Sequence, residues 1–419
     1  MNVPIPASKW RVSDEMTAAT KSSKTTESSS NIEGLTGDAA IARALKQCDI
    51  DVLSAYPITP QTIIVEDYQR FFADGEVKTK VIPVESEHSA MSACIGASAA
   101  GARVATTSAS AGLALMWEVL YCASGLRLPI VLAVANRALS APINIHNDWS
   151  DSYGARDSGF IQMYCQSCQE AYDTTIMSFK IAENHSVLLP AMVCIDGFIL
   201  SHNVEHVELL PDEVVRDFIG IRDPAQVLDP DKPITIGPIC FTDYYFEVKE
   251  QQDRAMKEVF RVYKEVESEF EKISGRSYGI YETYRTKDAD IVLLTHSSPA
   301  GTAKAVVDAL RDRGERVGLL RLKLFRPFPA ADIGKELASA KAVAVFEKCL
   351  SFGAAANPLA LEVRTALYEQ PKRPLVTDFV IGLGGRDVPP TVIVEGYNKT
   401  KQYLEKGKAP FYETLGVRK

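Results

Sequence analysis

Short apolar runs alternate with helix-forming segments from about Gly34 to about Gly220, and this alternation constrains the fold more than any other feature. The strand candidates are "DIDVLSA", "KVIPVE", "ARVATTS", "PIVLAVAN" and "LPAMVCID". Nearly continuous apolar strands that are separated by helices are typical of a parallel sheet covered on both faces. We therefore predict an α/β domain with a doubly wound sheet over residues 34–220.

A second alternating unit runs from Ala289 to about residue 405, with strand candidates "DIVLLTHS", "RVGLLRLKLF", "KAVAVFEK" and "PLVTDFVIGL". No sequence repeat relates the two units, so we predict two separate α/β domains. The segment between them, residues 221–288, begins with the proline-rich stretch "RDPAQVLDPDKPITIGP" and continues with apolar residues at helical spacing, which predicts a linker with an amphipathic helix. Residues 1–33 are predicted to be a disordered or extended arm, and residues 406–419 a C-terminal tail.

Composition and charge exclude several classes of protein. The chain has 419 residues, of which 46% are hydrophobic and 24% charged, as in soluble globular proteins. The net charge of −8 and the lack of a Lys/Arg cluster argue against a nucleic-acid partner. We find no apolar run long enough to span a membrane and no secretory signal, and we expect a cytoplasmic protein.

The cysteines favour the same compartment, because several of the eight lie inside apolar runs, where a reduced thiol packs as a small hydrophobe. Cys165 and Cys168 form a CxxC pair, but no second pair follows it. A zinc or iron–sulfur site with four ligands normally needs two more thiolates. We therefore predict no metal site and no cluster in this chain, and the role of this pair stays open.

The carboxyl ends of the predicted strands are where an open α/β sheet binds ligands. At the first end, "SAYPITPQT" places prolines on both sides of Ile58 and Thr59, and because proline fixes φ the loop should hold Thr59 in one orientation. The alternative is that this loop only connects two elements. At another end, Glu87 follows a strand next to Ser86, a good helix cap, and Glu87 could serve only the helix dipole.

Two further strand ends carry polar groups. The hydroxyl-rich turn "TTSASAGL" leads into a helix, and Arg137 comes directly after a buried strand. The alternative for Arg137 is an ion pair with a nearby carboxylate, Asp148 or Asp151. Taken together, a threonine, a carboxylate and an arginine at one crevice would suit a small carboxylate ligand. The later "GLGGRD" segment, residues 382–387, is weak evidence for an anion site, because a lone glycine cluster is common.

Seven blocks of the sequence resemble the α subunits of pyruvate:ferredoxin oxidoreductases, within the 2-oxoacid:acceptor oxidoreductase family. The blocks are "SAYPITPQT", "ESEHSAMSACIGASAAGARVATTSASAGL", "NRALSAPINIHNDWSD", "GARDSGF", "QEAYD", "LFRPFP" and "GLGGRDV". They follow the family's order over roughly residues 35–400, and several blocks in order are far more specific than one motif.

The resemblance implies a thiamine-diphosphate enzyme that converts pyruvate and CoA to acetyl-CoA and CO2 and passes electrons to ferredoxin. It implies that residues 34–220 form a pyrimidine-type thiamine-diphosphate-binding domain and residues 289–405 a transketolase C-terminal-like domain. Glu87 matches the family glutamate that bonds the cofactor's aminopyrimidine and is the expected catalytic residue. Thr59 and Arg137 match residues that hold the substrate carboxylate, and Pro57 and Ile58 are expected to contact the cofactor.

The sequence lacks the Gly-Asp-Gly segment with which thiamine enzymes anchor the diphosphate and Mg²⁺, and "TGDAA" at Thr36 has only its first two residues. The resemblance therefore implies half of an active site. A β subunit is expected to supply the diphosphate site, Mg²⁺ and an iron–sulfur cluster, and γ and ferredoxin-like δ subunits are expected as further partners. Two alternatives stay open: the same reaction on 2-oxoisovalerate, 2-oxoglutarate or oxalate, and a scaffold without catalytic function.

Overall fold

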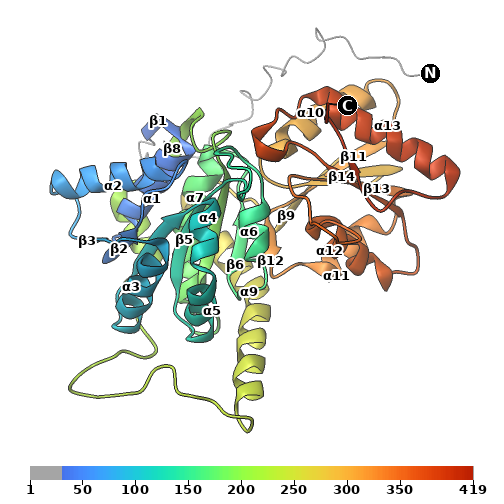
Figure 1. The fold of residues 1–419 in the computed structure, drawn as a ribbon. Helices are drawn as coiled ribbons and strands as arrows, with labels where there is room; N and C mark the ends of the chain where they lie inside the picture. Colours follow the sequence, from blue (N-terminus) through green and yellow to red (C-terminus); the bar gives the residue numbers. More distant parts are fainter. Residues whose placement is uncertain (1–30, 419) are drawn as a thin grey trace.

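Two α/β units, each built around its own sheet, lie next to each other in the computed structural model (Figure 1). The structure describes residues 31–418. The expected N-terminal arm lies outside the described residues up to residue 30. Its last three residues, 31–33, belong instead to strand β1 (Asn31–Thr36), which pairs antiparallel with β8 (Val204–Leu209).

The first sheet has seven strands in the order β12-β6-β7-β5-β4-β2-β3, and all of them except β12 run parallel. The strands are β2 (Val52–Ala55), β3 (Lys80–Pro83), β4 (Val104–Ser108), β5 (Ile130–Asn136), β6 (Ile161–Tyr164), β7 (Ala191–Asp196) and β12 (Leu324–Arg326). The central strands β4, β5 and β7 are buried along their whole length, as expected for a sheet covered on both faces.

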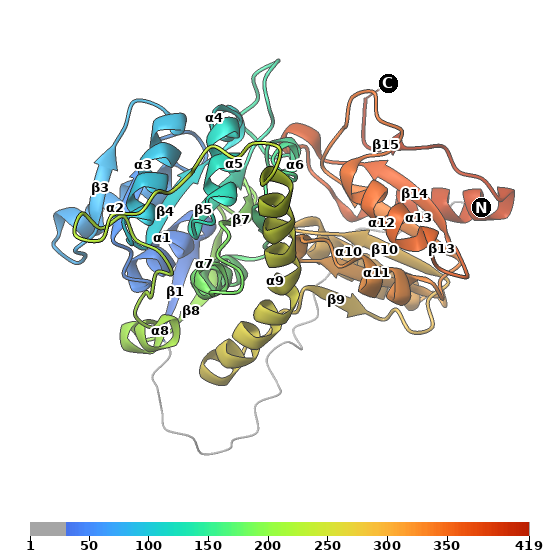
Figure 2. The same ribbon diagram turned by 90° about the horizontal axis from the view of Figure 1, so that it is seen from below.

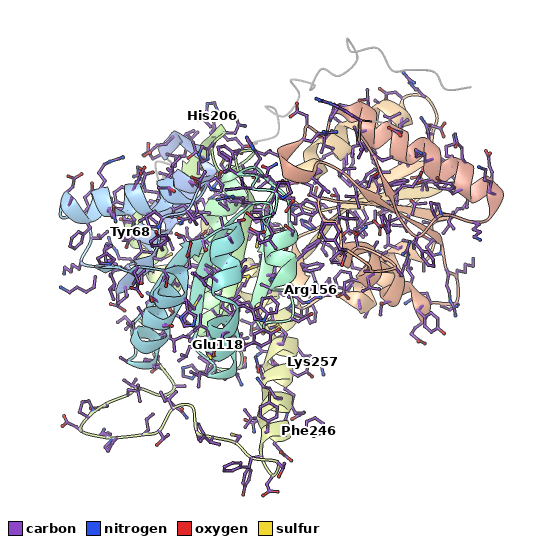
Figure 3. All side chains as sticks on the ribbon, viewed as in Figure 1. Tyr68, Glu118, Arg156, His206, Phe246 and Lys257 are labelled. Atoms are coloured by element: carbon purple, nitrogen blue, oxygen red, sulfur yellow. The ribbon has the colours of Figure 1, made fainter. Side chains whose placement is uncertain are left out.

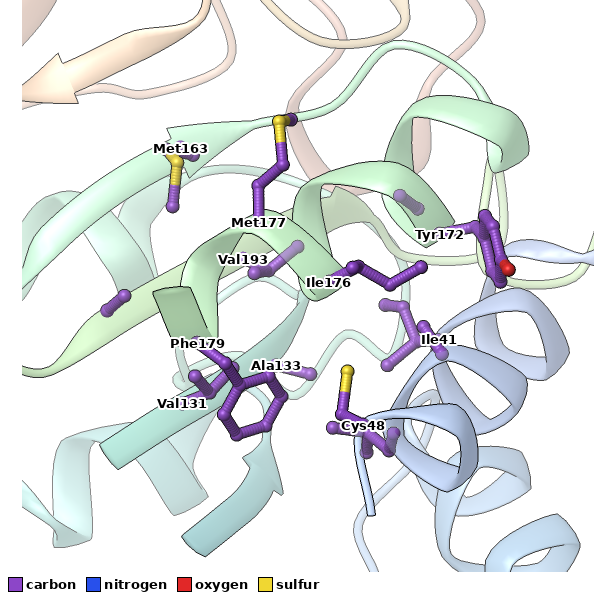
Figure 4. Packing of buried hydrophobic residues seen from close by; sticks show 14 of the residues in the cluster. Ile41, Cys48, Val131, Ala133, Met163, Tyr172, Ile176, Met177, Phe179 and Val193 are labelled. Atoms are coloured by element: carbon purple, nitrogen blue, oxygen red, sulfur yellow. The ribbon is translucent and has the colours of Figure 1, made fainter. Parts of the chain in front are cut away.

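Helices cover both faces of this sheet. The helices are α1 (Gly37–Gln47), α2 (Thr62–Ala73), α3 (Glu87–Ala99), α4 (Ser110–Leu115), α5 (Trp117–Gly125), α6 (Ser150–Gly154), α7 (Cys168–Glu183) and α8 (Asp212–Ile219). On one face, Ile41 of α1 and Ile176 of α7 pack with Val131 and Ala133 of β5, as Figure 4 shows. On the other face, α3 and α5 pack against the alternate residues of β5. Successive strand residues point to opposite faces, so one strand serves both cores.

The second sheet has six strands in the order β15-β14-β13-β10-β11-β9. Its strands are β9 (Tyr281–Tyr284), β10 (Ile291–Thr295), β11 (Val317–Leu322), β13 (Ala342–Glu347), β14 (Leu375–Val380) and β15 (Glu413–Thr414). Its helices are α10 (Pro299–Arg311), α11 (Ala330–Leu337), α12 (Pro358–Tyr368) and α13 (Pro390–Lys406), with a short 3₁₀ turn η3 (Leu383–Gly385). One face packs under α10 and α13, and the other under α11 and α12.

The two units are joined by more strand pairing and core packing than the sequence pattern predicts. The run "RVGLLRLKLF" is expected to be one strand, but it divides at Lys323, and its second part is β12, which pairs antiparallel with β6 of the first sheet. Strand β9 lies in the expected linker and pairs with β11. The apolar core under α3 and α5 also continues into the second unit, through residues such as Leu294 and Phe325.

The segment between the units crosses the lower ends of α3 and α5 as an extended chain and then enters α9 (Tyr245–Ser274), which Figure 2 shows clearly. The apolar stripe of α9 buries Val259, Tyr263 and Phe270, as the helical spacing predicts, whereas Ile273 stays 37% exposed. Phe246, in the first turn of α9, projects into solvent at the free end of this helix (Figure 3). Among residues 31–418, no helix is long and apolar enough to cross a membrane.

Candidate active site

The proline loop after β2 is tied to the neighbouring strand by a buried glutamine. Gln61 donates from Nε2 to the carbonyl oxygen of Tyr56 at 2.9 Å, and its Oε1 accepts a bond of 2.8 Å from the hydroxyl of Thr107. The backbone N–H of Gln61 also donates to the carbonyl of Ile58 at 3.0 Å. The loop is therefore held in one shape. It presents Thr59 and Pro57 at the surface, with Ile58 half-buried.

Arg137 follows β5 and reaches this loop directly. Its Nη1 donates to the carbonyl oxygen of Thr59 at 2.9 Å, and its Nε donates to the carbonyl of Asn144 at 3.1 Å. The residue is only 7% exposed, yet no carboxylate within residues 31–418 lies at ion-pair distance from its guanidinium. The structure thus rules out the ion pair with Asp148 or Asp151. The Nη2 group has no acceptor within the described chain.

Asp151 binds the backbone of Arg137 rather than its side chain. Its Oδ2 accepts bonds of 2.9 Å from the N–H groups of Arg137 and Ser110, and its Oδ1 accepts from Asn136 Nδ2 at 2.7 Å. Burial nevertheless raises the pKa of Asp151 to about 6, although these donors act in the opposite direction. This carboxylate joins the turn after β4 to the start of the Arg137 loop.

Glu87 is the first residue of α3, and Ser86 caps the helix by accepting a bond from the N–H of Ser89. Glu87 is 6% exposed, and its carboxylate has no hydrogen-bond or ion-pair partner among the described residues. It lies against Gly112 of α4, where a Cβ atom would collide with both the Glu87 carboxylate and the Ser108 hydroxyl. The buried Ser108 hydroxyl also lacks a partner in the described chain.

The second unit holds the Arg137 loop from the opposite side. Asn144 donates from Nδ2 to the carbonyl of Gly384 at 3.1 Å, and the N–H of Gly385 donates to the carbonyl of Asn147 at 2.6 Å. Both glycines have positive φ, and a side chain at either would collide with Asn144 or His146. The "GLGGRD" segment therefore packs on this loop.

Lys348 and Asp196 form a buried ion pair at the same junction. Lys348 Nζ lies 2.9 Å from Asp196 Oδ2 and donates to Asn147 Oδ1 at 3.0 Å. Trp149 donates from Nε1 to Asp196 at 2.8 Å, and His296 stacks on the Trp149 ring. Burial lowers the pKa of His296 to about 3, so the stacked ring is neutral near pH 7.

The described residues contain no group of three or more His, Cys, Asp or Glu side chains that could hold a metal ion. Cys165 and Cys168 are both buried free thiols. The first directly follows β6 and the second begins α7. Burial raises the pKa of each thiol to about 12. Neither contact nor charge assigns them a role.

The structure brings Thr59 and Arg137 into direct contact through the Thr59 backbone. Glu87 joins them through a chain of neighbours: Gly112 and Ser108, then the turn bound by Asp151. Sequence reasoning missed Gln61, and it named Asp151 only as a possible ion-pair partner of Arg137, not as a residue that binds backbone N–H groups. Gln61 lies inside a block quoted for the resemblance, but a polar residue in a proline loop gives no separate signal, and the partners of Asp151 come from three elements.

Comparisons with known proteins agree with this architecture. Residues 43–268 match the family model of pyruvate flavodoxin/ferredoxin oxidoreductases described as thiamine-diphosphate-binding, and residues 289–393 match pyruvate:ferredoxin oxidoreductase core domain II. The pyruvate synthase subunit PorA of Thermotoga maritima is 51% identical over 87% of this chain and 93% of its own length. That of Methanocaldococcus jannaschii is 49% identical over 86% and 93%.

A ketoisovalerate oxidoreductase subunit, VorA of Pyrococcus abyssi, is 42% identical over 89% of this chain and 94% of its own. Among solved structures, a 2-oxoglutarate:ferredoxin oxidoreductase from Magnetococcus marinus superimposes with a TM-score of 0.70 at 19% identity, over 88% of this chain and 65% of that chain. A split-gene transketolase matches more distantly, with a TM-score of 0.51 at 11% identity over 88% of this chain and 99% of that one. These last two likenesses show the fold. The chain belongs to the pyruvate flavodoxin/ferredoxin oxidoreductase family, and its first unit is the thiamine-diphosphate-binding domain of that family.

Proposed function

We propose that this chain is the α subunit of a pyruvate:ferredoxin oxidoreductase. The complex oxidatively decarboxylates pyruvate in the presence of CoA, yields acetyl-CoA and CO2, and passes the electrons to ferredoxin. The observation that carries the proposal is the Arg137 guanidinium, which is almost buried, fixed by two carbonyl groups and free of any carboxylate partner in the described chain.

Arg137 binds the carboxylate of the 2-oxoacid in this proposal. Its Nε–H and one N–H of Nη1 fix the plane of the guanidinium, so the second N–H of Nη1 and both N–H groups of Nη2 remain as donors for substrate. A charge-assisted bond of this kind orients a small acid strongly. The hydroxyl of Thr59 lies on the loop that Arg137 holds, and it supplies a neutral donor beside the cation. One cation and one hydroxyl suit a monocarboxylate.

Glu87 holds the aminopyrimidine of thiamine diphosphate in this proposal. Two observations fit this role. The Glu87 carboxylate is buried without a partner in the described chain, and the backbone of Gly112 lies so close to it that any side chain at that position would collide with the carboxylate. Thiamine diphosphate, when bound, supplies a nucleophilic carbon and the electron sink for decarboxylation. The contribution of Glu87 is to give a proton to the pyrimidine ring nitrogen or to share one with it, which favours the imino form of the ring. We expect Pro57 and Ile58, on the proline loop, to contact the cofactor.

The remaining groups are assigned to partner subunits. The sequence has no Gly-Asp-Gly segment, and residues 31–418 contain no cluster of side chains that could hold a metal ion. We therefore assign the diphosphate and Mg²⁺ ligands to a β subunit, which also carries an iron–sulfur cluster. A γ subunit and a ferredoxin-like δ subunit complete the path to ferredoxin. We place the complex in the cytoplasm, in keeping with eight cysteines that are all free thiols.

A second substrate is favoured by one specific observation. The relative named as a ketoisovalerate oxidoreductase subunit is nearly as similar over nearly the same length as the pyruvate synthase relatives. A branched monocarboxylate would use Arg137 and Thr59 in the same way. The proline loop offers no additional cation, and this counts against 2-oxoglutarate and oxalate, which carry a second carboxylate.

The test is a substrate panel on the purified complex, read by loss of iron–sulfur absorbance with CoA present. We expect pyruvate to give the highest kcat/KM, and Arg137→Met to lower kcat/KM by roughly tenfold to a hundredfold, since a charge-assisted bond is lost. Arg313→Met, which removes an exposed arginine of the second unit, is the matched control and should leave kcat/KM unchanged. A complex without bound thiamine diphosphate, or without response to any 2-oxoacid, would instead support the scaffold alternative.

A further inference from the structure

A pocket of 360 Å³ opens at the amino ends of the strands of the first sheet, away from the candidate active site. Its walls are the end of α3, the α5–β5 and α7–β7 connections, and the extended segment that begins at residue 221. Strand β5 has seven residues and separates this pocket from Arg137 by roughly 20 Å. The volume falls in the range of small-molecule sites.

Arg222 is the most deeply buried cation of this pocket, with a side chain that is 9% exposed. Its Nε has no acceptor within the described chain. Its Nη2 lies 3.3 Å from the Ser98 hydroxyl and 3.4 Å from the Ser98 carbonyl, both long for hydrogen bonds. A buried guanidinium with such weak contacts is under-satisfied, and an additional acceptor would stabilise it.

The carboxylate next to Arg222 is already bound by another arginine. Glu183 accepts two bonds of 2.9 Å from Arg103, whereas Arg222 Nη1 lies 3.5 Å from it. Burial lowers the pKa of Arg222, and the positive charge of Arg103 lowers it further, although Glu183 acts in the opposite direction. The pair of arginines shares one carboxylate, which leaves positive charge at the pocket wall.

Arg127 adds a second incompletely bound guanidinium. It donates to the carbonyl groups of Val187 and Leu188, and no carboxylate of the described chain lies at ion-pair distance from it. Two other ionisable groups line the pocket. Asp223 has a side chain that is 87% exposed, and His185 donates from Nε2 to the backbone carbonyl oxygen of Asp223 at 2.8 Å. Neither neutralises Arg127 or Arg222 inside the pocket.

We propose that this pocket binds a small molecule that carries an oxyanion, phosphate or carboxylate, on an apolar body. Arg127 and Arg222 bind the oxyanion. The apolar body packs against Leu126, Leu128, Leu188 and Ile236, which line the same pocket. The site is separate from the proposed substrate site, because it lies at the opposite edge of the sheet and shares no residue with it.

The test measures binding of phenyl phosphate, benzoate and phenol to the purified complex by calorimetry and by thermal shift. The three probes have the same ring and differ in the head group. We expect both anions to bind and phenol not to bind, and the tighter of the two anions identifies the preferred head group. Arg222→Gln is expected to weaken binding of that anion by roughly tenfold or more, since a charge-assisted bond is lost. Steady-state turnover of pyruvate is measured alongside.

Arg254→Gln is the matched control, because it removes the same charge from an exposed pair with Glu250 on α9, and it should leave binding unchanged. Arg127→Gln gives an independent test if Arg222→Gln fails to fold. Absence of binding at millimolar probe, equal binding of phenol, or unchanged affinity in both pocket variants would overturn the proposal. If the unmodified complex binds the anions but does not turn over pyruvate, the result counts against the proposed function and leaves the pocket proposal standing.

Discussion

The candidate active site and the junction between the two units treat buried charge in opposite ways. At the junction, Glu170 of α7 is fully buried and binds Arg321 at 2.9 Å and Lys323 at 3.0 Å. At the candidate site, Glu87 and Arg137 are almost as buried but have no charged partner in the described chain. Burying an unpaired charge costs free energy. The difference indicates that the paired groups at the junction stabilise the fold, and that Glu87 and Arg137 at the candidate site are available to bind a ligand.

The largest effect should come from the unpaired carboxylate. We expect Glu87→Gln to lower kcat by a factor on the order of a hundred or more, because a group that exchanges a proton with the cofactor is lost. The free energy of unfolding should stay the same or rise, because no contact with a charged partner is broken and the cost of burying an unpaired charge is removed. Steady-state kinetics and urea denaturation measure the two quantities. Glu118→Gln, at an exposed carboxylate of α5, is the control. If both variants had the same kcat, Glu87 would have no special part in catalysis.

The paired carboxylate should show the reverse pattern. Glu170→Gln leaves Arg321 and Lys323 buried with one partner fewer, and we expect it to lower the free energy of unfolding by about 3 kcal/mol or more. The kcat of the folded fraction should stay near that of the unmodified complex. Denaturant unfolding, combined with activity per folded molecule, measures both. A fully stable variant with reduced kcat would mean that Glu170 acts in catalysis.

The ion pairs of Glu170 with Arg321 and Lys323 also predict that the free energy of unfolding depends on pH within a defined range. Burial alone would raise the pKa of Glu170, but Arg321 and Lys323 lower it to about 2, compared with an ordinary value of 4.5. A carboxyl group with a lowered pKa stabilises the folded state above pH 4.5, and this stabilisation is lost as the pH falls from 4.5 towards 2. We expect the difference in unfolding free energy between the unmodified chain and Glu170→Gln to shrink by about 3 kcal/mol in that window. A difference independent of pH would contradict the ion pair.

The smallest effect should come from the contact between the second unit and the Arg137 loop. Asn144→Ala removes the bond to Gly384 but keeps the backbone carbonyl that binds Arg137. We expect the KM for pyruvate to rise by roughly fivefold, as for one net hydrogen bond, with a smaller change in kcat. Asn203→Ala, at an exposed residue of another loop, is the control. An unchanged KM would mean that the second unit does not position Arg137.

Much of the architecture could be predicted from the sequence, because the central strands of both sheets are apolar runs that are buried on both faces. Strands β4, β5 and β7 correspond to three of the predicted runs. The division at Lys323 could not be predicted, since the apolar pattern continues through β11 and β12 while the partner strand changes. Pairing partners are set by tertiary packing rather than by local pattern.

The candidate site also has a part that could be predicted from the sequence and a part that could not. Thr59, Glu87 and Arg137 could be singled out because each follows a predicted strand, and their roles remain proposals. Their surroundings could not be predicted. Asn144 meets Gly384, which lies 240 residues further along the chain, and Asp151 joins a turn that precedes it by 41 residues. Contacts over such distances leave no periodic signal in one sequence.

Strand β12 has a practical consequence for anyone who would divide this molecule. It closes the outer side of β6, with Leu324 opposite Met163 and the N–H of Tyr164 bonded to Lys323. A fragment that stops after α9 would leave β6 with open N–H and C=O groups along an apolar edge, the kind of template on which chains aggregate. The gap between the two family models is therefore a poor place to truncate, and a workable expression fragment has to retain the chain through Arg326.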